Sequence, residues 1–228
     1  MKKLSNKSGY TILVIILITT TIIFFYMVQT YRFYDLTALK KAVVIKPVFT
    51  SSAYQDNGFY SYYRGECNES CLTVKIIQAD RFESSNNALE IFKVNGVDII
   101  SDIDVHNNPS ILIQYKTVIM LHNEYVTQEE FDAVTSHPYV IYLYPNALYA
   151  KVQYHDGTIT LERGHNFPEI TVANGFDWKY DNSPLEREIK CKDWKFYAIG
   201  NGYMLNCNPE IIIKRNPEIL LKLIELVK

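Results

Sequence analysis

The sequence KTVIMLHNEYVTQEEFDAVTSHPYVIYLYPNALYAKV, residues 116–152, indicates a strand, a helix and a second strand. Thr117 to Leu121 is a short apolar run with β-branched residues, which is typical of a strand buried on both faces. Tyr139 to Tyr144 has the same character. Two strands joined by one helix are expected to be parallel, with a right-handed crossover.

Local signals place the ends of the intervening helix. Thr127 and Glu130 have the spacing of a capping box, in which each side chain satisfies a free backbone amide of the other. Val126 and Phe131 are spaced for a hydrophobic staple across this cap. The pair His137-Pro138 ends the helix, because proline disfavours helical geometry in the residue before it.

Polar residues follow both predicted strands. His122, Asn123 and Glu124 come after the first strand, and Asn146 comes after the second. Open parallel sheets place their sites at the carboxyl ends of strands, so we expect His122, Glu124 and Asn146 to meet in one pocket. A histidine and a carboxylate are common partners in a metal site or a general base. The alternative is that His122 caps a backbone group and Glu124 faces solvent.

The same alternation of strands and helices extends toward the N-terminus. Strands are expected at Ala42–Ile45, Leu72–Ile77 and Val97–Ile100. A helix with Leu89 and Phe92 lies between a cap at Ser84 or Ser85 and Gly96, and a short helix begins at Asn108-Pro109. This order predicts a doubly wound, largely parallel α/β sheet.

The pattern changes after Val152. Asp156-Gly157 is a hairpin signal, and Trp194–Asn206 is a second hairpin candidate that turns at Asn201-Gly202. Two NPEI segments, at Asn208 and Asn216, combine an asparagine cap, proline and an acidic first turn. The last helix carries an apolar stripe and is expected to pack on the sheet, with a membrane-surface helix as the alternative: Ile219, Leu220, Leu223, Ile224 and Val227.

The N-terminus predicts membrane attachment. Three lysines precede the uncharged run Thr11–Val28, which is near the lower length limit for a membrane-spanning helix. We expect a cytoplasmic tail at 1–10, an uncleaved signal anchor at 11–29, a tether at 30–50 and an extracytoplasmic domain at 51–228. A removed signal peptide is the alternative. The expected location is the plasma membrane, with a single span.

The four cysteines support an extracytoplasmic domain. Cys191 and Cys207 flank the second hairpin, which favours a disulfide outside the cytosol. Cys67 and Cys71 form a second candidate pair. Zinc binding and free thiols remain alternatives, although the spacing fits zinc poorly. The tripeptide Asn68-Glu69-Ser70 is a glycosylation sequon.

Charge and motifs exclude several classes. A net charge of −2 indicates no nucleic-acid partner. The sequence has no glycine-rich phosphate loop, no Gly-x-Ser-x-Gly elbow and no His-Glu-x-x-His. Asp102, Asp104 and His106 form a polar cluster at a neighbouring strand end, which would bind a cation or simply face solvent.

One ordered set of motifs resembles a known family. The run from Asn95-Gly96 through Asp102 and Asp104, the His122-x-Glu124-Tyr125 motif, and the turn with Asn146 and Tyr149 are similar to the C-terminal domain of the large subunit of N,N-dimethylformamidase. That resemblance covers residues 95–152. It implies a class I glutamine amidotransferase-like fold, which is flavodoxin-like in its layers.

The resemblance also implies a chemistry. In that family a single iron is held by tyrosines and one glutamate and activates water to cleave a small amide. By this match Glu124 is the metal ligand, and His122 and Asn146 lie near the reaction. Tyr54 is the match for a tyrosine ligand, and the second has no assigned match, although Phe82 stands near its expected position.

Two function classes follow. The first is a membrane-anchored domain that binds a small molecule or a protein without catalysis, and we expect this role. The alternative is a metal-dependent, iron-type hydrolase of small amides that uses Glu124 as a ligand.

Overall fold

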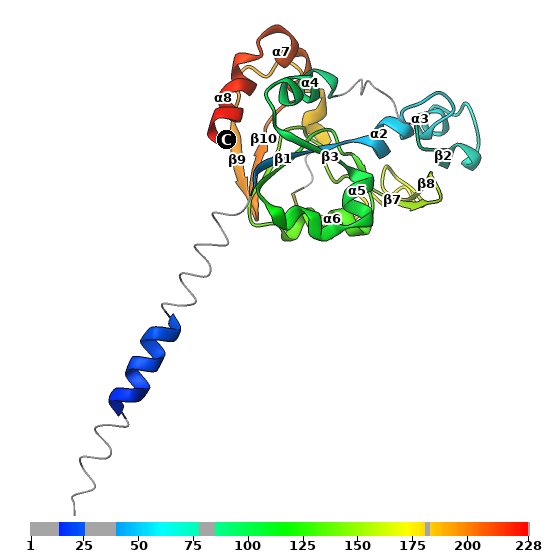
Figure 1. The fold of residues 1–228 in the computed structure, drawn as a ribbon. Coiled ribbons are helices and arrows are strands. Elements are labelled where there is room, and N and C mark those ends of the chain that lie inside the picture. Colours follow the sequence, from blue (N-terminus) through cyan, green and yellow to red (C-terminus); the bar gives the residue numbers. More distant parts are fainter. Residues whose placement is uncertain (1–13, 26–39, 78–84, 181–182, 228) are drawn as a thin grey trace, which may run out of the picture. The chain divides into compact units, whose positions relative to one another are not determined.

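The computed structural model of the 228-residue chain describes residues 14–25, 40–77, 85–180 and 183–227 (Figure 1). The chain divides into two units, Met1–Leu39 and Lys40–Lys228. The position of Phe82 lies outside the described residues.

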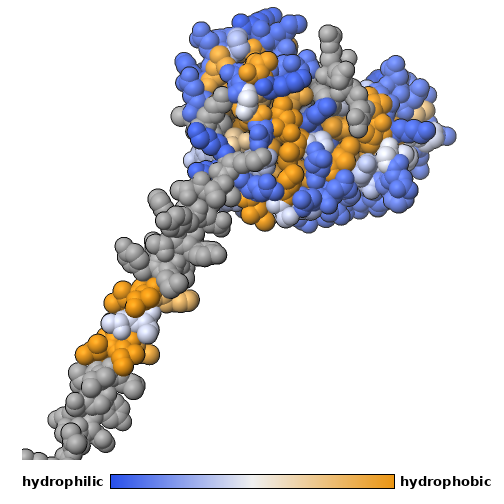
Figure 2. All heavy atoms as spheres, in the orientation of Figure 1, coloured by the Kyte–Doolittle hydropathy of each residue, from blue (hydrophilic) through white to orange (hydrophobic). Residues whose placement is uncertain are grey.

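Residues 14–25 of the first unit form a helix with mostly hydrophobic side chains (Figure 2). The hydroxyls of Thr19, Thr20 and Thr21 donate to backbone carbonyls one turn earlier, which satisfies them within the helix. Within the described ranges, no helix combines the length and apolarity needed to cross a membrane. Residues 11–13 and 26–29 of the expected anchor are outside those ranges.

The second unit is built on a six-stranded sheet. Its order is β3 (Asp98–Ser101), β1 (Lys40–Lys46), β4 (Tyr115–Met120), β6 (Val140–Tyr142), β10 (Gly202–Leu205) and β9 (Phe196–Ile199). The first five strands are parallel, and β9 pairs antiparallel with β10. The folded unit therefore begins at Lys40, inside the stretch interpreted as a tether.

Helices cover both faces of this sheet (Figure 1). The elements α4 (Asn86–Val94), α7 (Glu210–Arg215) and α8 (Glu218–Val227) cover one face, and α5 (Asp102–Asn107), η2 (Pro109–Gln114) and α6 (Gln128–Ser136) cover the other. Side chains of β1 alternate between the two cores, with Val44 in one and Val43 and Ile45 in the other. The doubly wound, largely parallel architecture is confirmed.

A second sheet of four strands lies in the order β2 (Thr73–Lys75), β8 (Thr158–Arg163), β7 (Ala150–His155) and β5 (Tyr125–Val126). Together with α2 (Val48–Ala53), α3 (Phe59–Tyr63) and η1 (Glu69–Leu72), it encloses a third core. The Asp156-Gly157 hairpin is confirmed, with φ values of 47° and 76°.

One predicted strand is shorter and less buried than expected. Leu72–Ile77 was expected to be a buried strand, but β2 spans only Thr73–Lys75, and it buries Val74 and exposes Thr73 and Lys75. The reason is its place at the edge of the small sheet, where it pairs with β8 alone.

The predicted β4–α6–β6 unit is confirmed, and β4 pairs directly with β6 in parallel. Its capping box is only half formed. The Thr127 hydroxyl accepts from the Glu130 amide at 3.3 Å, but within the described residues neither carboxylate oxygen of Glu130 has a hydrogen-bond partner. The Glu130 side chain is buried instead, near enough to Asp102 for the two carboxyls to interact.

The cluster of Asp102, Asp104 and His106 does not converge on one cation. These residues form α5, where Asp104 makes a capping box with Ser101. Buried Asp102 accepts from the Phe49 amide at 2.8 Å, and His106 contacts the Thr127 hydroxyl at 3.1 Å. The two carboxylates thus accept from backbone amides. Asp102 is buried, whereas Asp104 is exposed, as the solvent-facing interpretation expected.

The second hairpin turns one residue earlier than expected, at Gly200-Asn201. Gly202 belongs to β10 and pairs with Val140 of β6, and glycine is required there because a Cβ would lie 1.8 Å from the carbonyl oxygen of Val140. The Asn201 amide donates to the carbonyls of Val134 and His137, which holds the turn against the end of α6.

Both NPEI segments form helix starts. Asn208 and Asn216 accept from the amides of Glu210 and Glu218, each at 3.2 Å. Leu220 and Ile224 of α8 are buried in the core that α4 and α7 share. The expected packing of the last helix on the sheet is confirmed.

Both expected disulfides are present, Cys67–Cys71 and Cys191–Cys207, with Cα–Cα distances of 6.3 and 5.3 Å. Asn68 of the sequon is exposed between the first pair, and its glycosylation stays a prediction.

Removing the two disulfides should have unequal effects. The sequence separations are 16 for Cys191–Cys207 and 4 for Cys67–Cys71. In the chain-entropy model these loops correspond to about 3 and about 2 kcal/mol. Urea unfolding of the two double serine variants should therefore show a larger loss of unfolding free energy for C191S/C207S. The reverse order would contradict this account.

Glu130→Gln should stabilise the protein increasingly as pH rises. Burial and the neighbouring Asp102 raise the pKa of Glu130 well above its ordinary 4.5. The folded state then keeps a proton that the unfolded chain releases, so wild-type stability falls as pH rises above about 4.5 toward the folded pKa.

Thermal unfolding of both proteins at about pH 5 and about pH 8 tests this linkage. The difference in Tm between Glu130→Gln and wild type should widen at the higher pH, whereas exposed Glu90→Gln should show no such trend. Parallel pH curves for Glu130→Gln and wild type would show that Glu130 does not hold the proton.

Candidate metal centre

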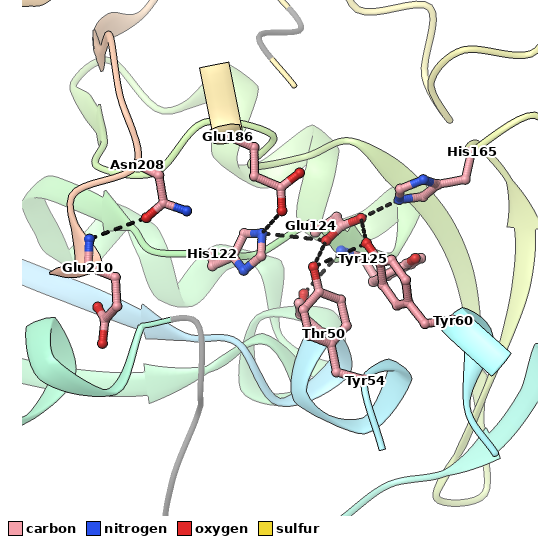
Figure 3. A network of polar contacts seen from close by, with 10 residues as sticks. All are labelled: Thr50, Tyr54, Tyr60, His122, Glu124, Tyr125, His165, Glu186, Asn208 and Glu210. Carbon is pink, nitrogen blue, oxygen red and sulfur yellow. Dashed lines mark hydrogen bonds and ion pairs between the residues drawn. The ribbon is translucent and has the colours of Figure 1, made fainter. Parts of the chain in front are cut away.

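The centre of the site is the carboxylate of Glu124, which is fully buried (Figure 3). The Tyr54 hydroxyl donates to Oε2, and the Tyr60 hydroxyl donates to Oε1 at 3.1 Å. Nε2 of His165 contacts Oε1 as well. Three side chains, two from the segment that follows β1 and one from the turn that follows β8, thus converge on one carboxylate.

Backbone hydrogen bonds fix the segment that carries Glu124. It leaves β4 at Met120, and Asn123 Oδ1 accepts from the Leu121 amide at 3.0 Å. The Glu124 carbonyl accepts from the amides of Tyr149 and Ala150 at 3.0 and 2.8 Å. The loop that follows β6 is therefore tied to the loop that follows β4, as the parallel unit predicts.

The two tyrosines come from the segment that follows β1. Tyr54 is the C-terminal cap of α2, and Tyr60 lies in α3. Gly58 allows the tight turn between them, because a Cβ there would lie 2.3 Å from the carbonyl oxygen of Ala53. The two hydroxyls consequently approach to 3.2 Å.

His122 lies on the other side of the carboxylate and is 2% exposed. Its Nε2 is 3.4 Å from Glu124 Oε2 and 3.9 Å from Oε1 of Glu186, which belongs to η3 (Ser183–Arg187). Asn146 adjoins His122 and favours its protonated form. In the described part of the chain, both amide atoms of Asn146 are buried and lack a partner with full hydrogen-bond geometry.

Burial and hydrogen bonding act in opposite directions on Glu124. Burial raises the pKa of this carboxyl, but the hydrogen bonds that it accepts from His165 and from the Tyr54 hydroxyl contribute to outweighing burial, so that the pKa is lowered. Glu124 is therefore ionised at neutral pH. Burial and the Glu124 charge raise the pKa values of Tyr54 and Tyr60, which keeps both phenols protonated as donors.

For the imidazole of His122, burial is the larger effect. Burial lowers its pKa, and the nearby Glu124 charge and Asn146 only partly oppose this effect. His122 is thus neutral at neutral pH and can accept a proton. Burial and the Glu124 charge raise the pKa of Glu186, whose side chain is 37% exposed at the rim of the site.

The structure brings together the residues that sequence reasoning selected. Tyr54 and His122 both contact Glu124, and Asn146 adjoins His122. Glu124 does not face solvent, so the alternative of an exposed carboxylate was wrong. Their catalytic and metal-binding roles stay predictions.

Three further residues were missed: Tyr60, His165 and Glu186. Tyr60 follows the matched Tyr54 by six positions in a segment that is rich in tyrosine, which is the signal that could have identified it. His165 follows a predicted strand in the turn-forming sequence Gly-His-Asn, which is a weak signal. No signal marks Glu186.

The side chains present fit a metal ion. Tyr54, Tyr60 and Glu124 offer hard oxygen donors that meet at one point, with an imidazole on each side. His122, Glu124 and Glu186 also have donor atoms within 4.8 Å of one another. Buried carboxylates and imidazoles that lie this close together are typical of metal sites.

No protein-family model matches the sequence, and the search of curated proteins found no match either. The resemblance to the dimethylformamidase domain therefore stays a prediction that rests on the motifs quoted above.

Proposed function

We propose that this domain is a metal-dependent hydrolase of a small amide, in which Tyr54, Tyr60 and Glu124 hold a ferric ion. The observation that carries the proposal is the convergence of two phenols on one buried, ionised carboxylate. Two phenolates and a carboxylate carry three negative charges. A trivalent ion balances them, and charge balance matters most where water is excluded.

The remaining polar groups suit hydrolysis. A bound metal lowers the pKa of its water, so that hydroxide is available near neutral pH. Neutral His122 is placed to accept a proton, and Glu186 lies 3.9 Å away at the rim. The unsatisfied amide of Asn146 supplies donors and an acceptor for a substrate amide.

Burial limits the substrate to a small molecule. His122, Glu124 and Asn146 are each 2% exposed or less. Side chains buried to this degree are not available to a polymer or a protein surface, so any substrate that reaches them must be compact. This supports the substrate class that the resemblance implies.

A binding domain without catalysis is the second candidate. One observation favours it: Glu124 accepts hydrogen bonds from three side chains of the protein, which compensate its buried charge within a polar network. Such a network would shape a pocket for a small ligand or stabilise a surface for a partner. Metal content and turnover separate the two candidates.

We further propose an extracytoplasmic location, with the N-terminal helix as a membrane attachment. The two disulfides support this location, because disulfides persist in oxidising compartments. Protease protection in intact cells tests it, since digestion of the domain from outside is expected.

The purified full-length protein should bind one ferric ion and show a visible tyrosinate-to-iron absorption band. Glu124→Gln should abolish binding, and Tyr54→Phe or Tyr60→Phe should each weaken it and reduce the band. Tyr203→Phe is the matched control, because Tyr203 is 41% exposed and lies on β10. Circular dichroism checks folding. Unchanged iron content in Glu124→Gln would refute the metal assignment.

His122→Ala should separate catalysis from binding. General acid–base groups contribute roughly 10²- to 10⁴-fold to rate, so hydrolysis of N,N-dimethylformamide should fall at least about 100-fold while iron content stays unchanged. Exposed His155→Ala is the control. An iron-loaded wild type that hydrolyses neither this probe nor other small amides would favour the binding domain.

A further inference from the structure

The residue that the proposed function leaves unexplained is His165. It lies two residues after the end of β8, at the tip of a turn closed by hydrogen bonds between Gly164 and Phe167 at 2.9 and 3.0 Å. Both central residues, His165 and Asn166, have left-handed backbones, with φ values of 53° and 62°. This conformation costs a non-glycine residue about 1–2 kcal/mol, and such strain clusters at functional sites.

Four tyrosine rings hold the imidazole in place. Its centroid lies 4.5 Å from Tyr149, 5.2 Å from Tyr63, 5.6 Å from Tyr125 and 5.9 Å from Tyr60. Tyr125 is stacked on it at 22°, and Tyr149 meets it edge-on at 86°. The ring orientation is thereby fixed, with Nε2 directed at Glu124 (Figure 3).

Nε2 of His165 contacts the same carboxylate oxygen, Oε1, that accepts the Tyr60 hydroxyl. An ion held by Tyr60 and Glu124 would therefore be within reach of this nitrogen. Without an ion, Nε2 carries the proton and donates to the carboxylate. With the proton on Nδ1 instead, the Nε2 lone pair faces the ion.

We propose that His165 is a fourth protein ligand of the metal, which completes a set of two phenolates, one carboxylate and one imidazole. The inference rests on the proposed function. An imidazole adds a ligand without adding charge, so the balance between three anionic donors and a ferric ion is preserved. His122 stays free on the opposite side, beside Glu186 and Asn146.

The competing explanation is that His165 only orients the carboxylate through a hydrogen bond. Loss of such a bond would also lower metal affinity, typically by about 10- to 100-fold. Affinity alone cannot separate the two roles. Direct coordination has a signature of its own, because the remote nitrogen of a coordinated imidazole modulates the pulsed EPR signal of the bound ion.

The test uses full-length wild type, His165→Asn and His122→Ala, each loaded with ferric citrate. Asparagine tolerates the left-handed conformation at position 165 but is too short to replace the imidazole. Wild type and His122→Ala should show nitrogen modulation, and His165→Asn should lose it. Iron affinity of His165→Asn, measured by competition with a chelator, should fall about tenfold or more.

The outcomes distinguish the two proposals. Nitrogen modulation that persists in His165→Asn, or that is absent from iron-loaded wild type, overturns the fourth ligand and leaves the proposed function standing. Wild type that takes up no iron overturns both. If His165→Asn fails to fold by circular dichroism, His165→Ala and titration with free imidazole replace it, and recovery of the modulation by imidazole supports the assignment.

Discussion

The burial of a negatively charged carboxylate is the constraint on which this domain depends. Glu124 is fully buried and ionised, and an uncompensated buried carboxylate costs several kcal/mol. Compensation comes from the hydroxyls of Tyr54 and Tyr60 and from His165. The tight turn at Gly58 and the strained turn at His165 both serve to deliver a donor to this carboxylate.

The position of Glu124 follows from the way the chain passes between two sheets. It leaves the six-stranded sheet at Met120 and enters the four-stranded sheet at Tyr125, so His122 and Glu124 lie on the connecting segment. The large sheet sets one end of this segment through the parallel β4–α6–β6 unit. The small sheet sets the other, because β5 pairs with β7 and the Tyr125 amide donates to the Thr50 hydroxyl.

Sequence reasoning could predict what local patterns encode. The parallel unit, the Asp156-Gly157 hairpin and the placement of His122, Glu124 and Asn146 at strand ends follow from hydrophobic period and turn chemistry, and the structure bears them out. His165 and Glu186 depend on how a second sheet and a 3₁₀ turn dock, which no local pattern encodes. The same limit explains Asp102, whose partner is the Phe49 amide, 53 positions earlier in the chain.

The wide sequence separation of these groups also has a consequence for biosynthesis. Tyr54 is 70 positions from Glu124, and His165 follows Glu124 by 41. Contacts of such long range form slowly, because closing the long intervening loops costs conformational entropy before any contact is gained. A nascent chain thus carries Tyr54, Tyr60 and Glu124 before the loop with His165 has been synthesised. The cluster is assembled only in a nearly complete domain, so truncated chains lack the assembled cluster.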